Sequence, residues 1–302
     1  MRNRLMGTAV ALAAVAFVAV STTACSIDVR GDGIVVREEK RFTVTGDPQL
    51  QLKTFDGSIR LKSWDRKEVL VEIERRGPDE ATAKAYVVNA SQDGNKIVVD
   101  VPRPDSQGNV VHIGSFGSHS VSLIVTAPRR MTLDARSGDG AIEADDLAGT
   151  IDIRTGDGSI RISRIDGVLK ARTGDGSMQI SDATGRVEAE SGDGSINVDG
   201  KFELLDLKSG DGSVHVRATD GSVVKSDWSI STGDGSIAVD LPATIDAELD
   251  AHSNDGSVNA NGFSGLESSQ KDDSGSVRGR LGKGGRALRV RSGDGSIAIN
   301  RR

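Results

Sequence analysis

The chain is poor in the residues that many binding chemistries need. It holds one Cys, which excludes an intrachain disulfide and a zinc site built from paired cysteines. Aromatic residues make up 3% of the chain, too few for a platform that stacks sugars or bases. Lys and Arg number 38 against 44 Asp and Glu, and a net charge of −6 argues against a nucleic-acid partner, which requires a basic face.

Glycine, by contrast, is abundant. The 302 residues include 37 Gly and only 6 Pro, and the Gly residues follow no Gly-X-Y period. This composition excludes collagen and indicates many tight turns. With 36% hydrophobic and 27% charged residues, the chain is expected to fold rather than remain disordered.

The first residues have the composition of an export signal. Arg2 and Arg4 precede an apolar run over residues 5–20, which is short for a membrane span. We therefore expect a signal peptide over residues 1–24 and export of the protein from the cytoplasm.

The single cysteine follows this segment directly. Ala24 and Cys25 resemble the end of a bacterial lipobox, in which the Cys is acylated and becomes the first mature residue, although Thr22 stands where a lipobox usually carries Leu. We expect a lipid on Cys25 that anchors the protein to the extracytoplasmic face of the cell membrane, with residues 25–34 forming the anchored Cys and a short polar tether. The alternative is a plain cleaved signal peptide that leaves Cys25 unmodified.

One motif, Ser/Thr-Gly-Asp-Gly-Ser-Ile, recurs with small changes through most of the chain. Its Asp recurs at a constant step of 18 residues and then at steps of 23, 21 and 39. The copies place this residue at Asp139, Asp157, Asp175, Asp193, Asp211, Asp234, Asp255 and Asp294. An early copy surrounds Asp56, and the longest step contains a degraded copy that begins at Asp273.

Each 18-residue unit divides into two halves of nine residues. Both halves carry Gly at the fourth place and apolar residues at the sixth and eighth, as in Ile160-Arg161-Ile162 after Gly158. An apolar-polar-apolar run after a Gly turn predicts a half-buried strand. Each unit therefore contains two short strands and two turns.

The apolar faces of these strands must be covered, and the gaps leave no room for helices. The chain can coil so that the two strands of each unit face each other, or it can run up and down as an antiparallel barrel. About nine units would make a barrel too wide for small side chains to fill. We predict an all-β fold, a β-solenoid like a parallel β-helix or β-roll, with coils of about 18 residues and two short strands per coil.

The regularity of the repeat divides the chain. We expect residues 137–302 to form the regular repeat solenoid and residues 35–136 to form its N-terminal part, with hairpin and loop insertions. A hairpin is predicted around Gln92-Asp93-Gly94-Asn95. Trp228 lies at a strand position, so we expect it in the core.

These features together resemble a known group. The lipobox-like start, a strand over residues 121–127 that ends at Pro128, and the serial Ser-Gly-Asp-Gly-Ser-Ile units are similar to the bacterial "putative adhesin" family of β-solenoid domains of unknown function. The likeness covers roughly residues 40–300. It implies an envelope protein without known catalysis and offers no binding residues to carry over.

Stacked coils would place the motif Asp residues in a ladder of like charges. At a spacing of about 4.8 Å each neighbouring pair costs about 1 kcal/mol in bulk water. Bound Ca²⁺ would offset this cost, but in calcium-binding nonapeptide repeats the Asp follows the second turn Gly by two places, where this motif holds Ile, Val or Met. The other interpretation is that each Asp caps its own turn and that a basic column three residues upstream neutralises the ladder. That column contains Arg136, Arg154, Arg172, Lys208 and Arg291 and is interrupted by Glu190.

Catalysis has little support in the sequence. The carboxylates are evenly spread, and no nucleophile elbow, P-loop or dinucleotide fingerprint is present. His112 and His119 share a polar loop, which is more typical of a solvated segment than of a metal site. We expect no catalytic residues and no cofactor, and predict an adhesion or interaction scaffold for an envelope protein or a wall polymer. The alternatives are a Ca²⁺-stabilised repeat module and a polysaccharide-acting parallel β-helix enzyme.

Overall fold

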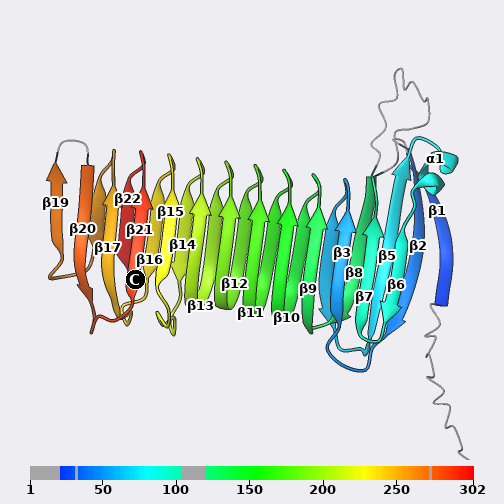
Figure 1. Cartoon of the computed structure of the whole chain (residues 1–302), viewed down its shortest axis with the longest axis horizontal. Coiled ribbons are helices and arrows are strands. Elements are labelled where there is room, and N and C mark those ends of the chain that lie inside the picture. Colours follow the sequence, from blue (N-terminus) through cyan, green and yellow to red (C-terminus); the bar gives the residue numbers. More distant parts are fainter. Residues whose placement is uncertain (1–20, 31–32, 104–119, 272–273) are drawn as a thin grey trace, which may run out of the picture.

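The computed structural model describes residues 21–30, 33–103, 120–271 and 274–302. This part of the chain is a long stack of strands with one short helix, α1 (Glu80–Ala85) (Figure 1). Side chains along the strands alternate between buried and exposed positions, as in β9 (Arg130–Ser137). Because this alternation puts apolar residues on one side only, the strands form two sheets with a shared core, which confirms the all-β prediction.

The two sheets run side by side along the stack; the first extends farther at the N-terminal end and the second at the C-terminal end. In the first sheet the order is β1 (Ser21–Arg30), β2 (Gly33–Thr43), β5 (Glu68–Gly77), β8 (Ser120–Pro128), β4 (Ile59–Trp64), the first parts of β10 (Ile142–Thr155), β11 (Ile160–Thr173), β12 (Met178–Ser191) and β13 (Ile196–Ser209), then β14 (Val214–Ala218), β16 (Ile237–Leu241), β22 (Ile297–Arg301) and β18 (Val258–Asn261). In the second sheet it is β6 (Asn89–Asp93), β7 (Lys96–Val101), β3 (Gln49–Thr54), β9, the later parts of β10 to β13, then β15 (Trp228–Thr232), β21 (Ala287–Ser292), β17 (Ala247–Ser253), β20 (Ser274–Leu281) and β19 (Glu267–Lys271).

The central coils stack in parallel and in register. Ile142 pairs with Ile160, Ile160 with Met178, and Met178 with Ile196, so each step along the stack is one 18-residue repeat. Equivalent positions of the motif therefore lie beside each other. The β-solenoid prediction is confirmed, and the antiparallel barrel is excluded.

The corner between the two sheets differs from the predicted turn. In the regular coils the two predicted short strands join into one 14-residue strand, such as β11, that bends in its middle. The bend contains Arg164 with φ 55° and Gly167 with φ 134°. A Cβ on Gly167 would lie 2.2 Å from the carbonyl oxygen of Gly149 in the preceding coil, so the corner requires glycine there.

The core is narrow and mostly aliphatic. Leu, Ile, Val and Ala fill the inward positions of every coil, and residues such as Ile153 and Leu169 are fully buried. Trp228 is also fully buried, as predicted, and meets Phe202 edge to face with ring centroids 6.3 Å apart. Burial of each large aliphatic side chain contributes about 1.5–3 kcal/mol, so the stack draws its stability from every coil.

Antiparallel strands cover the two ends of the stack. At the N-terminal end β1, β2 and β5 follow one another in antiparallel pairs, and β6 forms the predicted hairpin with β7. At the C-terminal end β20 runs antiparallel to β17 and pairs with β19. The degraded copy of the motif is not a further turn of this kind: Ser274-Gly275-Ser276-Val277 lies within β20, which runs antiparallel to β17, and Asp273 lies outside the described residues.

Of the expected signal peptide, residues 1–20 lie outside the described part of the chain, and residues 21–24 belong to β1. Cys25 and the residues of the expected tether up to Arg30 also belong to β1, which pairs antiparallel with β2 along its length, Cys25 lying opposite Glu38. His112 and His119 lie outside the described residues. Among the described residues, no helix has the length and apolar character needed to cross a membrane.

The order of coils in space departs from their order in the sequence at both ends. Coil β3–β4 lies between coil β7–β8 and coil β9–β10. Coil β21–β22 lies between coil β15–β16 and coil β17–β18. The mark of the C-terminus in Figure 1 accordingly lies inside the stack, away from the end strand β19.

Replacing the corner glycine tests the close approach of the coils. Gly167→Ala is expected to lower the free energy of unfolding by more than about 2 kcal/mol, because the new Cβ collides with a backbone oxygen and the positive φ disfavours Ala. Gly94→Ala is the matched control, since Gly94 also has a positive φ but no atom lies within 4 Å of its added Cβ. Equal losses for the two variants in urea unfolding would contradict this account of the corner.

Candidate functional site

The motif turns line one edge of the solenoid, with one turn for each coil. The eight sequence-predicted Asp residues all lie in these turns, and all eight are exposed. We call this row the Asp edge; its members are Asp139, Asp157, Asp175, Asp193, Asp211, Asp234, Asp255 and Asp294. The structure thus brings the predicted residues into one line along the stack.

The buried partner of this edge is a ladder of hydroxyl groups, which the sequence analysis overlooked. Thr173 Oγ1 donates a hydrogen bond to the Gly158 carbonyl of the preceding coil (2.9 Å) and accepts one from the Gly176 N–H of its own turn (3.3 Å). The first place of the motif supplies the same buried hydroxyl in successive coils: Ser137, Thr155, Thr173, Ser191, Ser209, Thr232, Ser253 and Ser292. The sequence signal for this ladder was that the first place of each of these motif copies is Ser or Thr.

The turns also join one another through their backbones. Gly174 N–H donates to the Gly156 carbonyl at 2.5 Å, and Gly192 N–H donates to the Gly174 carbonyl at 2.6 Å. A Cβ on Gly176 would lie only 2.0 Å from the Gly158 oxygen. The two glycines of the motif are therefore required by the approach of neighbouring turns.

The Asp residues do not cap these turns, which corrects the expectation from sequence. Among the described residues, no hydrogen bond or ion pair engages the carboxylates of the Asp edge. The turn N–H groups donate instead to the buried Ser and Thr hydroxyls, as Gly194 does to Ser191 at 3.1 Å. The hydroxyl occupies the inner side of the turn, where it reaches both coils.

The basic column does not neutralise the Asp edge either. Arg136 pairs with Asp134 (2.9 Å) and Arg154 with Asp152 (2.7 Å), each two residues earlier on the same outer face. Arg172 pairs with Glu190 of the next coil at 3.2 Å. Sheet neighbours are closer to these guanidinium groups than the turn is, so the ladder of exposed Asp charges is relieved mainly by water and salt.

The described residues do not assemble a recognisable metal centre. No group of three or more His, Cys, Asp and Glu side chains within them is placed to hold a metal ion. The Asp edge supplies one carboxylate for each coil, whereas Ca²⁺ takes six to eight oxygen ligands. His215 lies 3.6 Å from Asp240, and His252 shares a hydrogen bond with Asn254.

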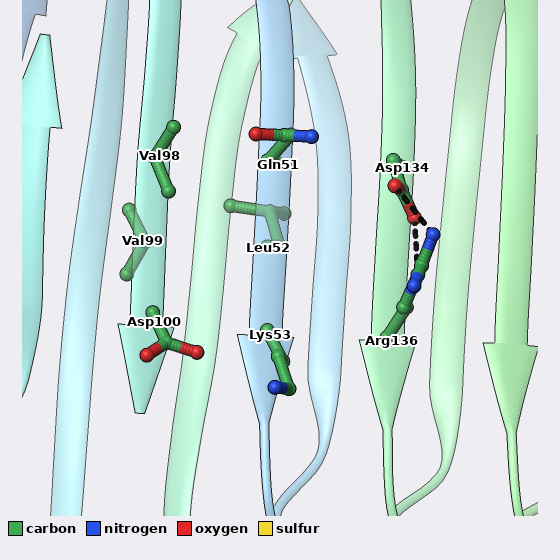
Figure 2. Close-up of a pocket in the computed structure, with 8 residues that line it drawn as sticks. All are labelled: Gln51, Leu52, Lys53, Val98, Val99, Asp100, Asp134 and Arg136. Carbon is green, nitrogen blue, oxygen red and sulfur yellow. Dashed lines mark hydrogen bonds and ion pairs between the residues drawn. The ribbon is translucent and has the colours of Figure 1, made fainter. Parts of the chain in front are cut away.

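A shallow hollow lies on the outer face of the second sheet near its N-terminal end. Its volume is about 360 Å³, and it lies over β7, β3 and β9. The residues that line it are Gln51, Leu52, Lys53, Val98, Val99, Asp100, Asp134 and Arg136. Figure 2 shows Asp134 and Arg136 joined by hydrogen bonds, while Lys53 and Asp100 occupy paired positions on adjacent strands.

Rows of charge continue along both outer faces. On the second sheet Lys170 pairs with Glu188 at 2.8 Å across neighbouring coils. On the first sheet Glu143 lies between Arg60 (3.6 Å) and Arg161 (3.3 Å). Because the coils are in register, charges of both signs repeat at about 4.8 Å along the stack. Each face is a regular array of polar groups.

Several carboxylates in these arrays are held in the ionised form. Hydrogen bonds from Ser63 and Arg129 lower the pKa of Asp146 at the corner of the first regular coil. Burial opposes ionisation of Asp250, but hydrogen bonds from Arg291 and Arg278 outweigh it and lower its pKa. These charge pairs link neighbouring strands of the outer faces.

Comparison with known proteins gives one family. Residues 48–300 match the family model described as Toastrack DUF4097. No curated protein matches the chain.

Solved structures that match the chain are distant from it in sequence. They include a "putative cell adhesion protein" from Clostridium sporogenes, with 14% identity, a TM-score of 0.31, and coverage of 88% of this chain and 99% of that one. A "putative lipid binding protein" from Parabacteroides distasonis has 14% identity, a TM-score of 0.47, and coverage of 88% and 96%. A "putative adhesin" from Bacteroides fragilis has 12% identity, a TM-score of 0.39, and coverage of 88% and 97%. These likenesses carry no argument about function.

The hydroxyl ladder makes a direct prediction. Thr173→Val keeps the shape of the side chain but leaves the Gly176 N–H and a bond to the Gly158 carbonyl unsatisfied, so we expect a loss of about 1–3 kcal/mol in the free energy of unfolding. Thr173→Ser is the control and should retain most of the stability, since Ser occupies the same place at Ser191. Urea unfolding that finds the Val variant as stable as the parent would contradict the role of the ladder.

The Asp edge makes a second prediction. Asp175→Ser removes one charge between Asp157 and Asp193, so the melting temperature is expected to rise slightly at low salt. The gain should vanish in 0.5 M NaCl, because salt screens the repulsion between exposed charges and the Debye length falls to about 3 Å at 1 M. Millimolar Ca²⁺ should have no more effect on the parent protein than Mg²⁺ at the same concentration. A melting temperature that rises with Ca²⁺ alone, and falls in Asp175→Ser, would show instead that the edge is a calcium site.

Proposed function

Because the chain belongs to the Toastrack family, DUF4097, and its folded part presents two long faces of fixed polar groups, we propose that it is a non-catalytic interaction scaffold of the cell envelope. A lipid on Cys25 holds it on the extracytoplasmic side of the membrane. The partner is an envelope protein or a wall polymer that contacts an outer face of the solenoid.

The observation that carries this proposal is the register of the coils. Turn glycines, buried hydroxyls and backbone bonds fix the spacing of the stack, so the backbone positions that carry the outward side chains repeat regularly from coil to coil. A preorganised surface loses little conformational entropy when it binds. The outer faces are thereby suited to an extended partner that makes many small contacts.

The hollow shown in Figure 2 combines a recessed surface with charges that are free of ion pairs within the described part of the chain. Arg136 is engaged by Asp134, whereas Lys53 and Asp100 form no ion pair within 4.0 Å among the described residues. They remain available for a partner that carries both polar donors and acceptors. We place the main contact of the partner at this hollow.

Capture from envelope extracts tests the scaffold function. The full chain with Cys25→Ser is immobilised and exposed separately to envelope proteins and to purified wall polymer, beside the same chain with Lys53→Glu and Asp100→Lys. A matched control carries Lys170→Glu and Glu188→Lys, on the same face but several coils away. The proposal expects capture that is lost in the first variant and kept in the control. Equal capture by all three proteins, or none in any extract, would overturn it.

Lipidation is tested separately in a bacterial host that acylates lipoproteins. Labelled palmitate is expected to enter the parent chain, and Cys25→Ser should abolish labelling and release the protein from the membrane fraction. Thr22→Leu, which restores the usual lipobox residue, should increase the labelled fraction. Labelling that persists in Cys25→Ser, or a parent chain free of label, refutes the anchor without affecting the scaffold proposal.

A further inference from the structure

The coil formed by residues 287–301 fills a slot between two coils that precede it in the sequence. We call this coil the insert; it contains β21, β22 and the motif turn between them. On one side it pairs with β15 and β16, and on the other side with β17 and β18. The chain therefore leaves room for one coil after β16, and the insert fills that place later in the sequence.

The insert is bonded fully on both sides. Ser292 Oγ donates to the Gly235 carbonyl at 2.9 Å, and Ser253 Oγ of the next coil donates to the Gly295 carbonyl at 2.7 Å. The large apolar side chains of the insert are 0% exposed: Leu288, Val290, Ile297 and Ile299. The same contacts would form with this segment from any copy of the chain.

The walls of the slot also match each other. Thr232 in β15 and Ser253 in β17 both align with Ser292 of the insert, so the two walls carry the motif in one register. Ile237 and Val258 both align with Ile297 on the other sheet. If the insert leaves, the strands on the two sides of the slot can pair with each other, so their backbone groups keep hydrogen-bond partners.

The insert is joined to the preceding part of the solenoid by a glycine-rich hinge. Residues 282–286 read Gly-Lys-Gly-Gly-Arg, and Gly282, Gly284 and Gly285 have φ values of 55°, 77° and 138°. Glycine changes such angles at little cost. The regular coils, by contrast, follow one another through continuous strands such as β11 and β12.

We propose that the insert is exchangeable and that the slot of one molecule accepts the insert of a second copy of this chain. Exchange replaces each contact by an identical one, so only the hinge and the protein concentration decide between closure within one molecule and exchange between two. Because a short hinge gives closure within one molecule an effective concentration in the millimolar range, isolated molecules are monomers and crowded ones exchange. This inference rests on the fold and does not require the proposed envelope partner.

Two single-cysteine variants test the exchange. Both are full chains with Cys25→Ser; one carries Ser229→Cys in β15 and the other Arg289→Cys in β21. These two positions are exposed and lie opposite each other in the parallel register, at a spacing that suits a disulfide. The mixed proteins are warmed to just below the melting temperature, cooled, oxidised mildly and separated on a non-reducing gel. A chain with both substitutions shows whether the bond forms within one molecule.

The proposal expects a covalent dimer of the two variants, at least tenfold above the background given by Ser229→Cys mixed with Lys170→Cys. Lys170 lies on the same outer face but beside other strands, so this pair reports random collision only. A yield equal to that background, with the intramolecular bond formed in the double variant, would overturn the proposal.

A peptide supplies a second measurement if that intramolecular bond does not form. A fluorescent peptide of residues 287–302 is warmed and cooled with the full chain, and the two are separated by gel filtration. The peptide is expected to elute with the protein, whereas the same peptide with Leu288→Asp and Val290→Asp should not. Failure of the parent peptide to elute with the chain contradicts exchange.

Discussion

The close approach of successive turns is the constraint on which the rest of the structure depends. Where the motif turns stack, a Cβ on Gly158 or Gly176 would lie 2.2 or 2.0 Å from a carbonyl oxygen of the preceding turn. Only glycine fits there, and the space beneath it is filled by a Ser or Thr hydroxyl that bonds both coils. The sequence repeat therefore reflects one contact between turns that recurs in each coil. The thin aliphatic core, the register of the sheets and the line of turns all follow from it.

A surface built in this way separates stability from recognition. Inward residues and turn residues determine the stack, while outward residues such as Lys53, Lys170 and Glu188 can differ from coil to coil without changing the backbone. Charge pairs on the faces add little to stability because they remain in contact with water. In the proposed scaffold function it is their regular spacing that matters, since the proposed partner would meet the same array in every molecule. The proposed scaffold function and the exchangeable insert both use this repetition, the first on the faces and the second within the stack.

The repeat allowed the fold to be predicted but not the use of every residue. Periodic apolar positions and Gly turns left two arrangements, a coil and an antiparallel barrel, and the coil was preferred because about nine units would make a barrel too wide for small side chains to fill. The motif Asp was expected to cap its own turn, because carboxylates commonly do so. In the structure the turn N–H of Gly176 donates instead to the buried hydroxyl of Thr173. The order of the last coils could not be predicted, because Ser253 and Ser292 carry equivalent motifs and either coil fits against Thr232. The lipid on Cys25 remains a prediction from the N-terminal pattern.

Amide hydrogen exchange at the motif turns tests the central claim most directly. Exposed turns ordinarily exchange their amide protons quickly, but Gly174, Gly192 and Gly210 donate theirs to carbonyl groups of the preceding turns at 2.5 to 2.6 Å. The account predicts that these three amides are protected as strongly as those of the neighbouring strands, and that protection falls together across the stack when Thr173→Val is introduced. Rapid exchange at these glycines in an otherwise protected solenoid would show that the turns do not hold the coils together.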